Sequence, residues 1–150
     1  DVDPGRYYRY TPAAKQLRPL LEDRPLLAGQ ALSPVKAIRY PVADGTMIPG
    51  YLTLPAGRSD AKGLPAIVMP HSSSLGRDEW GFDWMAQYFA QRGYAVVQPN
   101  FRGSSGYGDQ WYQNNGFKSW KAAVGDVADA GRWIVTEGGD PAKLSIVGWS

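Results

Sequence analysis

Three short apolar runs alternate with two segments of helical periodicity, and this alternation most constrains the fold. The runs cover residues 64–69, 94–98 and 144–147, and apolar side chains recur at helical spacing within 80–92 and 120–137. Strands joined by helices in this order form crossover connections and lie parallel to one another. The chain is therefore expected to build a largely parallel sheet covered by helices on both faces.

A hairpin is predicted ahead of this unit. Residues 35–40 and 47–54 have extended patterns on either side of the turn dipeptide Asp44-Gly45. Pro49 lies inside the second of these strands and cannot donate a ladder hydrogen bond. We therefore expect that strand to lie at a sheet edge or to contain a bulge.

The first 32 residues have a different character. Residues 6–10 are typical of a strand, but three prolines punctuate the next segment and should prevent a continuous element, at Pro12, Pro19 and Pro25. We interpret residues 1–32 as the end of an upstream module with a linker, and 33–150 as one domain. A flexible arm that covers the edge of the domain is the alternative.

Composition excludes several function classes. The 16 basic and 14 acidic residues form no run that would follow a phosphate backbone, so no nucleic-acid partner is expected. The chain has no cysteine and one histidine, which predicts no metal centre. The glycine-rich segment 103–108 lacks the lysine of a P-loop and the dinucleotide spacing, so no cofactor is predicted. No apolar stretch is long enough to span a membrane, and the compartment stays open.

The last predicted strand leads directly into Gly148-Trp149-Ser150. This is the first half of a G-x-S-x-G nucleophile elbow, in which a strand of an α/β-hydrolase sheet delivers a serine onto a strained turn. We therefore predict that Ser150 is a nucleophile. The expected fold is an incomplete α/β-hydrolase fold, made of an amino-terminal hairpin and a β-α-β-α-β unit that ends at the elbow.

A serine nucleophile needs a base oriented by an acid, and donors for the oxyanion. In α/β-hydrolases the acid and the histidine follow the serine, so both should lie beyond residue 150. His71 comes after the strand at 64–69 and opens the Ser72-Ser73-Ser74 loop, which in this fold helps to form the oxyanion hole. That position favours an oxyanion or structural role for His71 over proton transfer; a loop histidine without a role is the alternative.

Four other residues invite a chemical interpretation. Arg102 is predicted to tie its loop to a neighbouring carboxylate, and Tyr107 either lines a substrate cleft or packs. Asp126 and Asp129 lie three residues apart on one predicted helix, as an acid/base pair could. They are placed away from the apolar stripe or at its edge, so we interpret them as solvated or salt-bridged helix residues.

Several motifs in a fixed order resemble the catalytic domain of the prolyl oligopeptidase family, over about residues 33–150. The branch that contains dipeptidyl and acylaminoacyl peptidases is the most similar. The resemblance is carried by His71, Arg77-Asp78, Gly81-Phe82-Asp83-Trp84, Gly93-Tyr94-Ala95-Val96, the segment from Asn100 to Gly108, Gly125-Asp126-Val127, Asp140-Pro141 and Gly148-Trp149-Ser150.

The resemblance implies a serine peptidase that cleaves short peptides, with an upstream β-propeller that restricts access to the site. Residues 1 to about 30 would then be the end of the propeller and a hinge. In the family the elbow continues as Ser-Tyr-Gly-Gly, and the amide after the serine is an oxyanion donor. The peptide specificity, and whether cleavage is internal or terminal, stay open.

The chain departs from the family at one loop. The family has His-Gly-Gly-Pro where this chain has His71-Ser72-Ser73-Ser74. Glycine permits positive φ and a close backbone approach, whereas serine at positive φ costs roughly 1 kcal/mol or more. We therefore expect either a displaced or disordered loop, or a serine hydroxyl in place of an amide donor.

Two other functions are compatible with the sequence. One is a carboxylesterase, because fold and nucleophile do not fix the leaving group. The other is a non-catalytic fragment, since a sheet that ends after the nucleophile strand leaves an edge and a face uncovered. We then expect self-association, or binding of a complementing carboxyl-terminal half. The isolated chain is predicted to be inactive.

Overall fold

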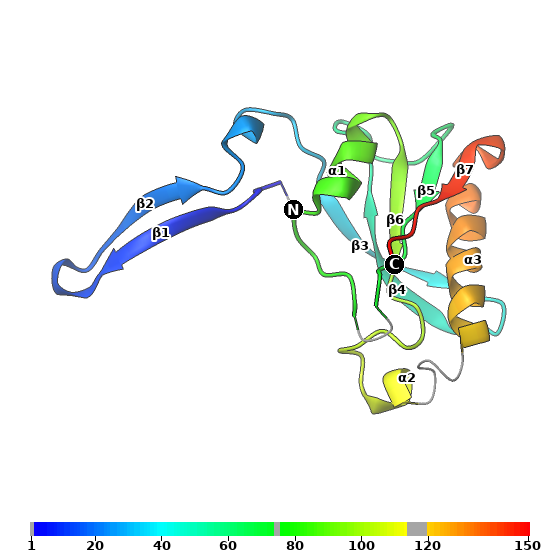
Figure 1. Ribbon diagram of the computed structural model, residues 1–150. Helices are drawn as coiled ribbons and strands as arrows, with labels where there is room; N and C mark the ends of the chain where they lie inside the picture. The colour runs from blue at the N-terminus through cyan, green and yellow to red at the C-terminus, as the bar shows by residue number, and fades with distance from the viewer. Residues whose placement is uncertain (1, 74–75, 114–119) are drawn as a thin grey trace.

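The computed structural model describes residues 2–73, 76–113 and 120–150. It consists of a two-stranded hairpin at the amino terminus and a sheet domain with helices on both faces (Figure 1). The hairpin extends away from the sheet domain as a separate arm.

The arm is formed by β1 (Arg6–Thr11) and β2 (Gln16–Glu22), which pair antiparallel. It is longer than the sequence predicted, because its prolines occupy tolerated positions. Pro12 begins the 3₁₀ turn between the strands (Pro12–Ala14), and Pro19 pairs with Tyr8, beside a register shift. A second 3₁₀ turn (Pro25–Leu27) comes after β2.

The domain contains a five-stranded sheet in the order β3-β4-β6-β5-β7. Its strands are β3 (Val35–Pro41), β4 (Met47–Thr53), β5 (Ala66–Val68), β6 (Ala95–Pro99) and β7 (Leu144–Ile146). Strands β6, β5 and β7 are parallel, as predicted, and β3 and β4 form the predicted hairpin. Because β4 also pairs antiparallel with β6, the sheet is mixed rather than largely parallel.

Pro49 marks neither an edge strand nor a bulge, and that prediction was wrong. Strand β4 lies inside the sheet, between β3 and β6. The Asn100 N–H donates to Pro49 O at 2.8 Å, but proline has no N–H with which to return the bond. The pairing of β4 with β6 accordingly begins at the next residue, Gly50.

Helices α1 (Trp84–Gln91) and α3 (Trp120–Thr136) cover opposite faces of the sheet. Adjacent residues of β5 alternate between them: Val68 packs in the cluster beneath α3, and Ile67 in the cluster beneath α1. Helix α1 is shorter than the predicted span 80–92, since the Asp83 side chain caps it by accepting from the amides of Met85 and Ala86.

Helix α3 buries only part of its predicted apolar stripe. Ala130 and Ile134 are fully buried, whereas Trp120 and Val124, nearer its start, are exposed. The predicted cap, Ser119, lies outside the described residues. A short helix, α2 (Asp109–Gln113), and a 3₁₀ turn (Pro141–Lys143) complete the elements.

Candidate active site

Ser150 has the backbone conformation of a nucleophile elbow. It comes after β7 at φ +62°, and within the described ranges Lys15 is the other non-glycine residue at positive φ. Such a conformation is costly for a residue with a Cβ, and it clusters at functional sites. Ser150 is also exposed. A strained, accessible serine four residues after the end of a parallel strand agrees with the arrangement that the motif predicts.

The three parallel strands bring the candidate residues to one edge of the sheet. His71 comes three residues after β5, Asn100 directly after β6, and Ser150 after β7. The Val147 amide extends the β7–β5 pairing by donating to Val68 O at 3.0 Å. The chain end and the loop that leads to α2 leave the sheet at this edge (Figure 1), where α/β folds gather their catalytic groups.

His71 is held by two neighbours from the loop after β6. Its Nε2 lies 2.7 Å from Ser104 Oγ, and its ring stacks on Phe101 with a centroid distance of 4.3 Å. Burial lowers the pKa of His71, while a hydrogen bond with the Ser73 backbone acts in the opposite direction. The imidazole is therefore neutral at pH 7, and Ser104 already engages its Nε2 atom.

Ser104 and His71 form a serine–histidine pair that the sequence did not reveal. Ser104 is 0% exposed, so a substrate cannot reach its hydroxyl. The pair therefore joins two loops and supplies no nucleophile. The sequence offered little signal, because Ser104 lies in a small-residue stretch, 103–106, that is typical of any tight turn.

The loop after His71 lacks the strain expected from its serines. Ser72 and Ser73 are exposed, and neither is among the described residues with positive φ. Ser73 O accepts a hydrogen bond from Gly76 N at 3.0 Å. The physical reason for a displaced loop is thus absent at these two positions. Ser74 lies outside the described residues.

Arg102 ties its loop to carboxylates, as predicted. Its Nη2 donates to Asp126 Oδ1 at 2.7 Å and its Nε to Asp126 Oδ2 at 3.0 Å, while Nη1 reaches Asp44 Oδ2 at 2.5 Å. Asp126 is fully buried and also accepts the Arg102 backbone amide. This network joins α3, the loop after β6 and the β3–β4 turn.

The interpretation of Asp126 and Asp129 as salt-bridged is confirmed, whereas solvation is wrong for both. Asp129 accepts from Ala43 N at 2.9 Å and pairs with Arg132. Both carboxylates are buried, because the β3–β4 turn and the loop after β6 pack over the polar side of α3. Neither aspartate is placed for acid/base chemistry, since each is committed to a cation or an amide.

The Asn100 side chain connects the loop after β5 to the loop after β6. Its Oδ1 accepts from Asp78 N at 2.7 Å, and its Nδ2 donates to Asp78 O at 3.0 Å and to Tyr107 Oη at 2.8 Å. The side chain is fully buried. A further bond, from Ser105 N to Gly76 O at 3.0 Å, joins the same two loops. Residues 71–78 and 100–108 are therefore tied together by hydrogen bonds.

Asp78 has a carboxyl group in an unfavourable environment for charge. Gln98 Nε2 donates to Oδ1 at 3.1 Å, but buried Oδ2 has no hydrogen-bond partner among the described residues. Burial raises the pKa of Asp78 to about 7; the nearby Asp83 carboxylate adds to the rise, and the bond from Gln98 opposes it. Asp78 therefore gains a proton near neutral pH.

The raised pKa predicts that Asp78→Asn stabilises the protein above pH 7. The folded state binds more protons than the unfolded state between the ordinary pKa of an aspartate and about 7, so stability falls as pH rises through this window. Asparagine carries no charge, and we expect it to add about 1 kcal/mol to the unfolding free energy at pH 8. Chemical unfolding at pH 8 and at pH 4 measures this gain. A gain that is equal at both pH values would contradict the assignment.

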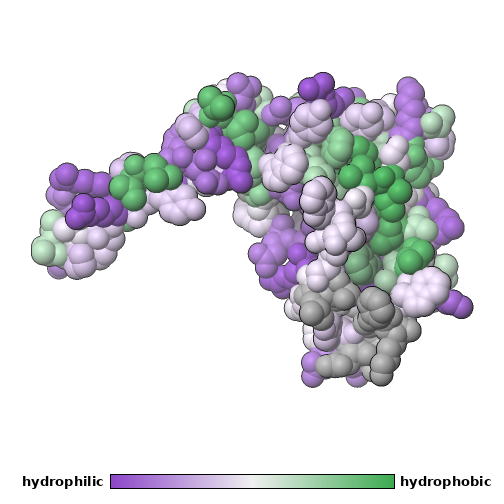
Figure 2. Space-filling view, viewed as in Figure 1, coloured by the Kyte–Doolittle hydropathy of each residue, from purple (hydrophilic) through white to green (hydrophobic). Residues whose placement is uncertain are grey.

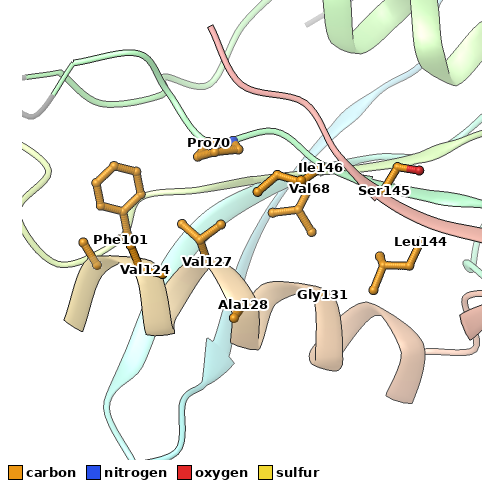
Figure 3. A pocket seen from close by; sticks show the side chains of 11 residues that line it. Val68, Pro70, Phe101, Val124, Val127, Ala128, Gly131, Leu144, Ser145 and Ile146 are labelled. Carbon is orange, nitrogen blue, oxygen red and sulfur yellow. The ribbon is translucent and has the colours of Figure 1, made fainter. Parts of the chain in front are cut away.

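A separate apolar trough of about 560 Å³ runs between α3 and β7 (Figure 3). Its lining is almost entirely aliphatic or aromatic and includes Val68, Phe101, Val124, Val127, Leu144 and Ile146. Ile146, on the edge strand, is 65% exposed. Hydrophobic side chains gather over this side of the domain (Figure 2). Ser150 does not line the trough.

The described part of the chain offers neither a metal cluster nor a membrane-spanning helix. No group of three or more His, Cys, Asp or Glu side chains within these residues could hold a metal ion. None of the described helices has the length and apolar content to cross a membrane.

Comparison with known proteins agrees with this geometry. Residues 80–150 match the model of the prolyl oligopeptidase family. Dipeptidyl aminopeptidase BIII of Pseudoxanthomonas mexicana is 36% identical over 140 residues, which cover 88% of this chain and 20% of that enzyme. The chain belongs to the prolyl oligopeptidase family. The resemblance carried by its motifs is thereby confirmed.

Two further proteins match nearly the whole chain. Dipeptidyl peptidase family member 6 of Caenorhabditis elegans is 28% identical over 99% of this chain and 23% of its own length. A puromycin-hydrolysing peptidase of Mycobacterium tuberculosis superposes with a TM-score of 0.82 at 27% identity, covering 98% of this chain and 23% of that chain. The chain thus spans about a fifth of the length of the relatives that it matches.

A structure of lower identity supports the fold alone. Acylaminoacyl peptidase of Pyrococcus horikoshii superposes with a TM-score of 0.72 at 21% identity over 90% of this chain. The sheet order, the parallel strands that lead to His71, Asn100 and Ser150, and the elbow are those of an incomplete α/β-hydrolase fold. The predicted fold class is confirmed.

Proposed function

We propose that this chain supplies the nucleophile, Ser150, of a serine peptidase that hydrolyses short peptides through an acyl-enzyme. The observation that carries the proposal is the exposed serine at φ +62° after a parallel strand. Relatives that are named as dipeptidyl peptidases support the choice of a peptide substrate.

The proposed reaction is that of an activated serine. Ser150 Oγ attacks the peptide carbonyl carbon, and a general base takes the hydroxyl proton and passes it to the leaving amine as the C–N bond breaks. Water then hydrolyses the ester and restores the serine. We propose that the base and its orienting acid come from a segment beyond residue 150, so that residues 1–150 alone are inactive.

The loops that surround the elbow are assigned to the oxyanion and the substrate cleft. His71 has its Nε2 bound to Ser104, which supports a structural role near the oxyanion rather than proton transfer. Ser72 and Ser73 are exposed on the loop that in α/β-hydrolases supplies an oxyanion donor. Tyr107 is assigned to the substrate cleft. Arg102 is assigned to holding the loop after β6, on which Tyr107 lies.

The exposed surfaces support a complementing partner. The trough beside α3 is apolar, and β7 is an edge strand with an exposed apolar side chain at Ile146. Such surfaces recruit another chain or aggregate. We propose that the segment carrying the base and the acid covers them in a longer protein, and that the isolated chain self-associates.

The arm is assigned to an upstream module that ends within residues 1–32. An isolated two-stranded hairpin is marginally stable in water, and all seven residues of β2 and five of the six in β1 are exposed. Tyr8, Tyr10, Leu17 and Leu21 are among them. We propose that further strands, of a β-propeller, pack against this arm.

Intact mass with a fluorophosphonate probe tests the function. The full-length protein is expected to gain one probe, on Ser150, and the 150-residue chain of 16.4 kDa none. Parallel assays with an aminoacyl anilide and a short acyl ester separate a peptidase from a carboxylesterase. Turnover of the ester alone would replace the peptidase proposal with the esterase, and an unlabelled full-length protein would reject both.

A further inference from the structure

We propose that Tyr107 donates a hydrogen bond to a carbonyl oxygen of the peptide substrate, and that Asn100 is the positioning residue that fixes the Tyr107 hydroxyl as a donor. This inference rests on the proposed peptidase function. It specifies that Tyr107 is the donor in its hydrogen bond with the substrate. The substrate atom at this place must therefore be an acceptor.

The orientation of the Asn100 amide follows from its backbone partners. A backbone N–H can only donate, so the atom 2.7 Å from Asp78 N is the carbonyl oxygen Oδ1. A backbone carbonyl can only accept, so the atom 3.0 Å from Asp78 O is Nδ2. Both contacts require the same orientation. Because Asn100 is fully buried, no exchange with water relaxes this requirement.

This orientation determines what Tyr107 can do. The second hydrogen of Nδ2 is donated to Tyr107 Oη at 2.8 Å, so the phenol oxygen is the acceptor in that bond. Its own proton is left for another acceptor, and none is found among the residues that the structure describes. Burial raises the pKa of Tyr107, so the hydroxyl keeps this proton at neutral pH.

The position of Tyr107 indicates which part of a substrate it meets. Its ring packs against Trp111 with a centroid distance of 5.8 Å, and the residue is 36% exposed. The residue lies on the loop after β6, and β5 separates β6 from β7, the strand that leads to Ser150. We infer that Tyr107 contacts a main-chain carbonyl away from the scissile bond. A donor at this place selects an acceptor and rejects an ammonium group.

Two substitutions in the full-length protein test the inference. Tyr107→Phe removes the donor, and we expect kcat/KM for a peptide anilide to fall about fivefold, chiefly through KM. Asn100→Asp keeps the acceptor for Asp78 N, places a carboxylate oxygen against Tyr107 Oη, and loses the bond to Asp78 O. The tyrosine proton then bonds to residue 100 instead of to the substrate, and a similar fall is expected.

The double variant separates positioning from a merely structural role. If Asn100 acts through the hydroxyl, adding Asn100→Asp to Tyr107→Phe lowers kcat/KM little further. Effects that multiply, in variants whose melting temperatures match, would overturn the role of Asn100. Tyr107→Phe with the kcat/KM of the parent would overturn the substrate contact. Tyr88→Phe, at an exposed tyrosine on α1, is the matched control and is expected to retain parent kinetics.

Labelling by the fluorophosphonate separates a failure of this inference from a failure of the proposed peptidase function. Ser150 of both single variants is expected to react with the probe at the parent rate, because Tyr107 contacts the peptide substrate and not the nucleophile. A parent protein that does not react at all would remove the peptidase proposal and this inference together. A parent that reacts, with an unchanged Tyr107→Phe variant, would remove the inference alone.

Discussion

Ser150→Ala is expected to abolish peptide hydrolysis by the full-length protein. Removal of a serine peptidase's nucleophile lowers kcat by about 10⁶-fold, because the remaining groups cannot form the acyl-enzyme. Alanine occupies positive φ at a cost similar to that of serine, and the Ser150 side chain is exposed. The fold should therefore be retained. Hydrolysis of an aminoacyl anilide and unfolding by heat measure the two properties.

The control for this variant must be another exposed serine. Ser59→Ala, in the loop between β4 and β5, is expected to hydrolyse the anilide at the parent rate. Ser104→Ala is not a matched control, because the Ser104 hydroxyl is buried, bonds to His71 and cannot contact a substrate. Activity that survives in Ser150→Ala would show that the elbow does not carry the nucleophile.

The parts of the fold that could be predicted have local causes. Strands β5 and β6 are buried on both faces, and this burial requires short continuous apolar runs. Ser150 could be assigned because the elbow needs a glycine, a serine and a preceding strand, all adjacent in sequence. A structural feature that depends only on neighbouring residues produces a pattern in the sequence from which it can be predicted.

The residues that escaped prediction depend on contacts between distant segments. Asn100 bonds to Asp78, 22 residues away, and Ser104 bonds to His71, 33 residues away. No periodicity along the chain records such pairs. Asp126 was assigned to the edge of an apolar stripe because helical spacing gives no information about which loop packs over a helix face. Tertiary packing therefore decides which polar residues are buried.

Asp126→Ala is expected to lower the free energy of unfolding by about 3–5 kcal/mol. The substitution leaves the Arg102 guanidinium, which is 16% exposed, without the carboxylate that accepts from its Nε and Nη2 atoms. The Arg102 amide also loses its acceptor. A mostly buried cation that keeps only its exposed partner, Asp44, accounts for this large expected loss, and chemical unfolding at pH 7 measures it.

The second carboxylate on Arg102 provides the matched control. Asp44 lies on the β3–β4 turn and its side chain is 52% exposed, so solvent screens its pairing with the same guanidinium. Asp44→Ala is expected to cost about 1 kcal/mol or less. Equal losses in the two variants would mean that charge alone, irrespective of burial, holds the loop after β6. A much larger loss of unfolding free energy for Asp126→Ala would show that the buried bidentate pair of Arg102 and Asp126 holds the loop on which Tyr107 lies in place.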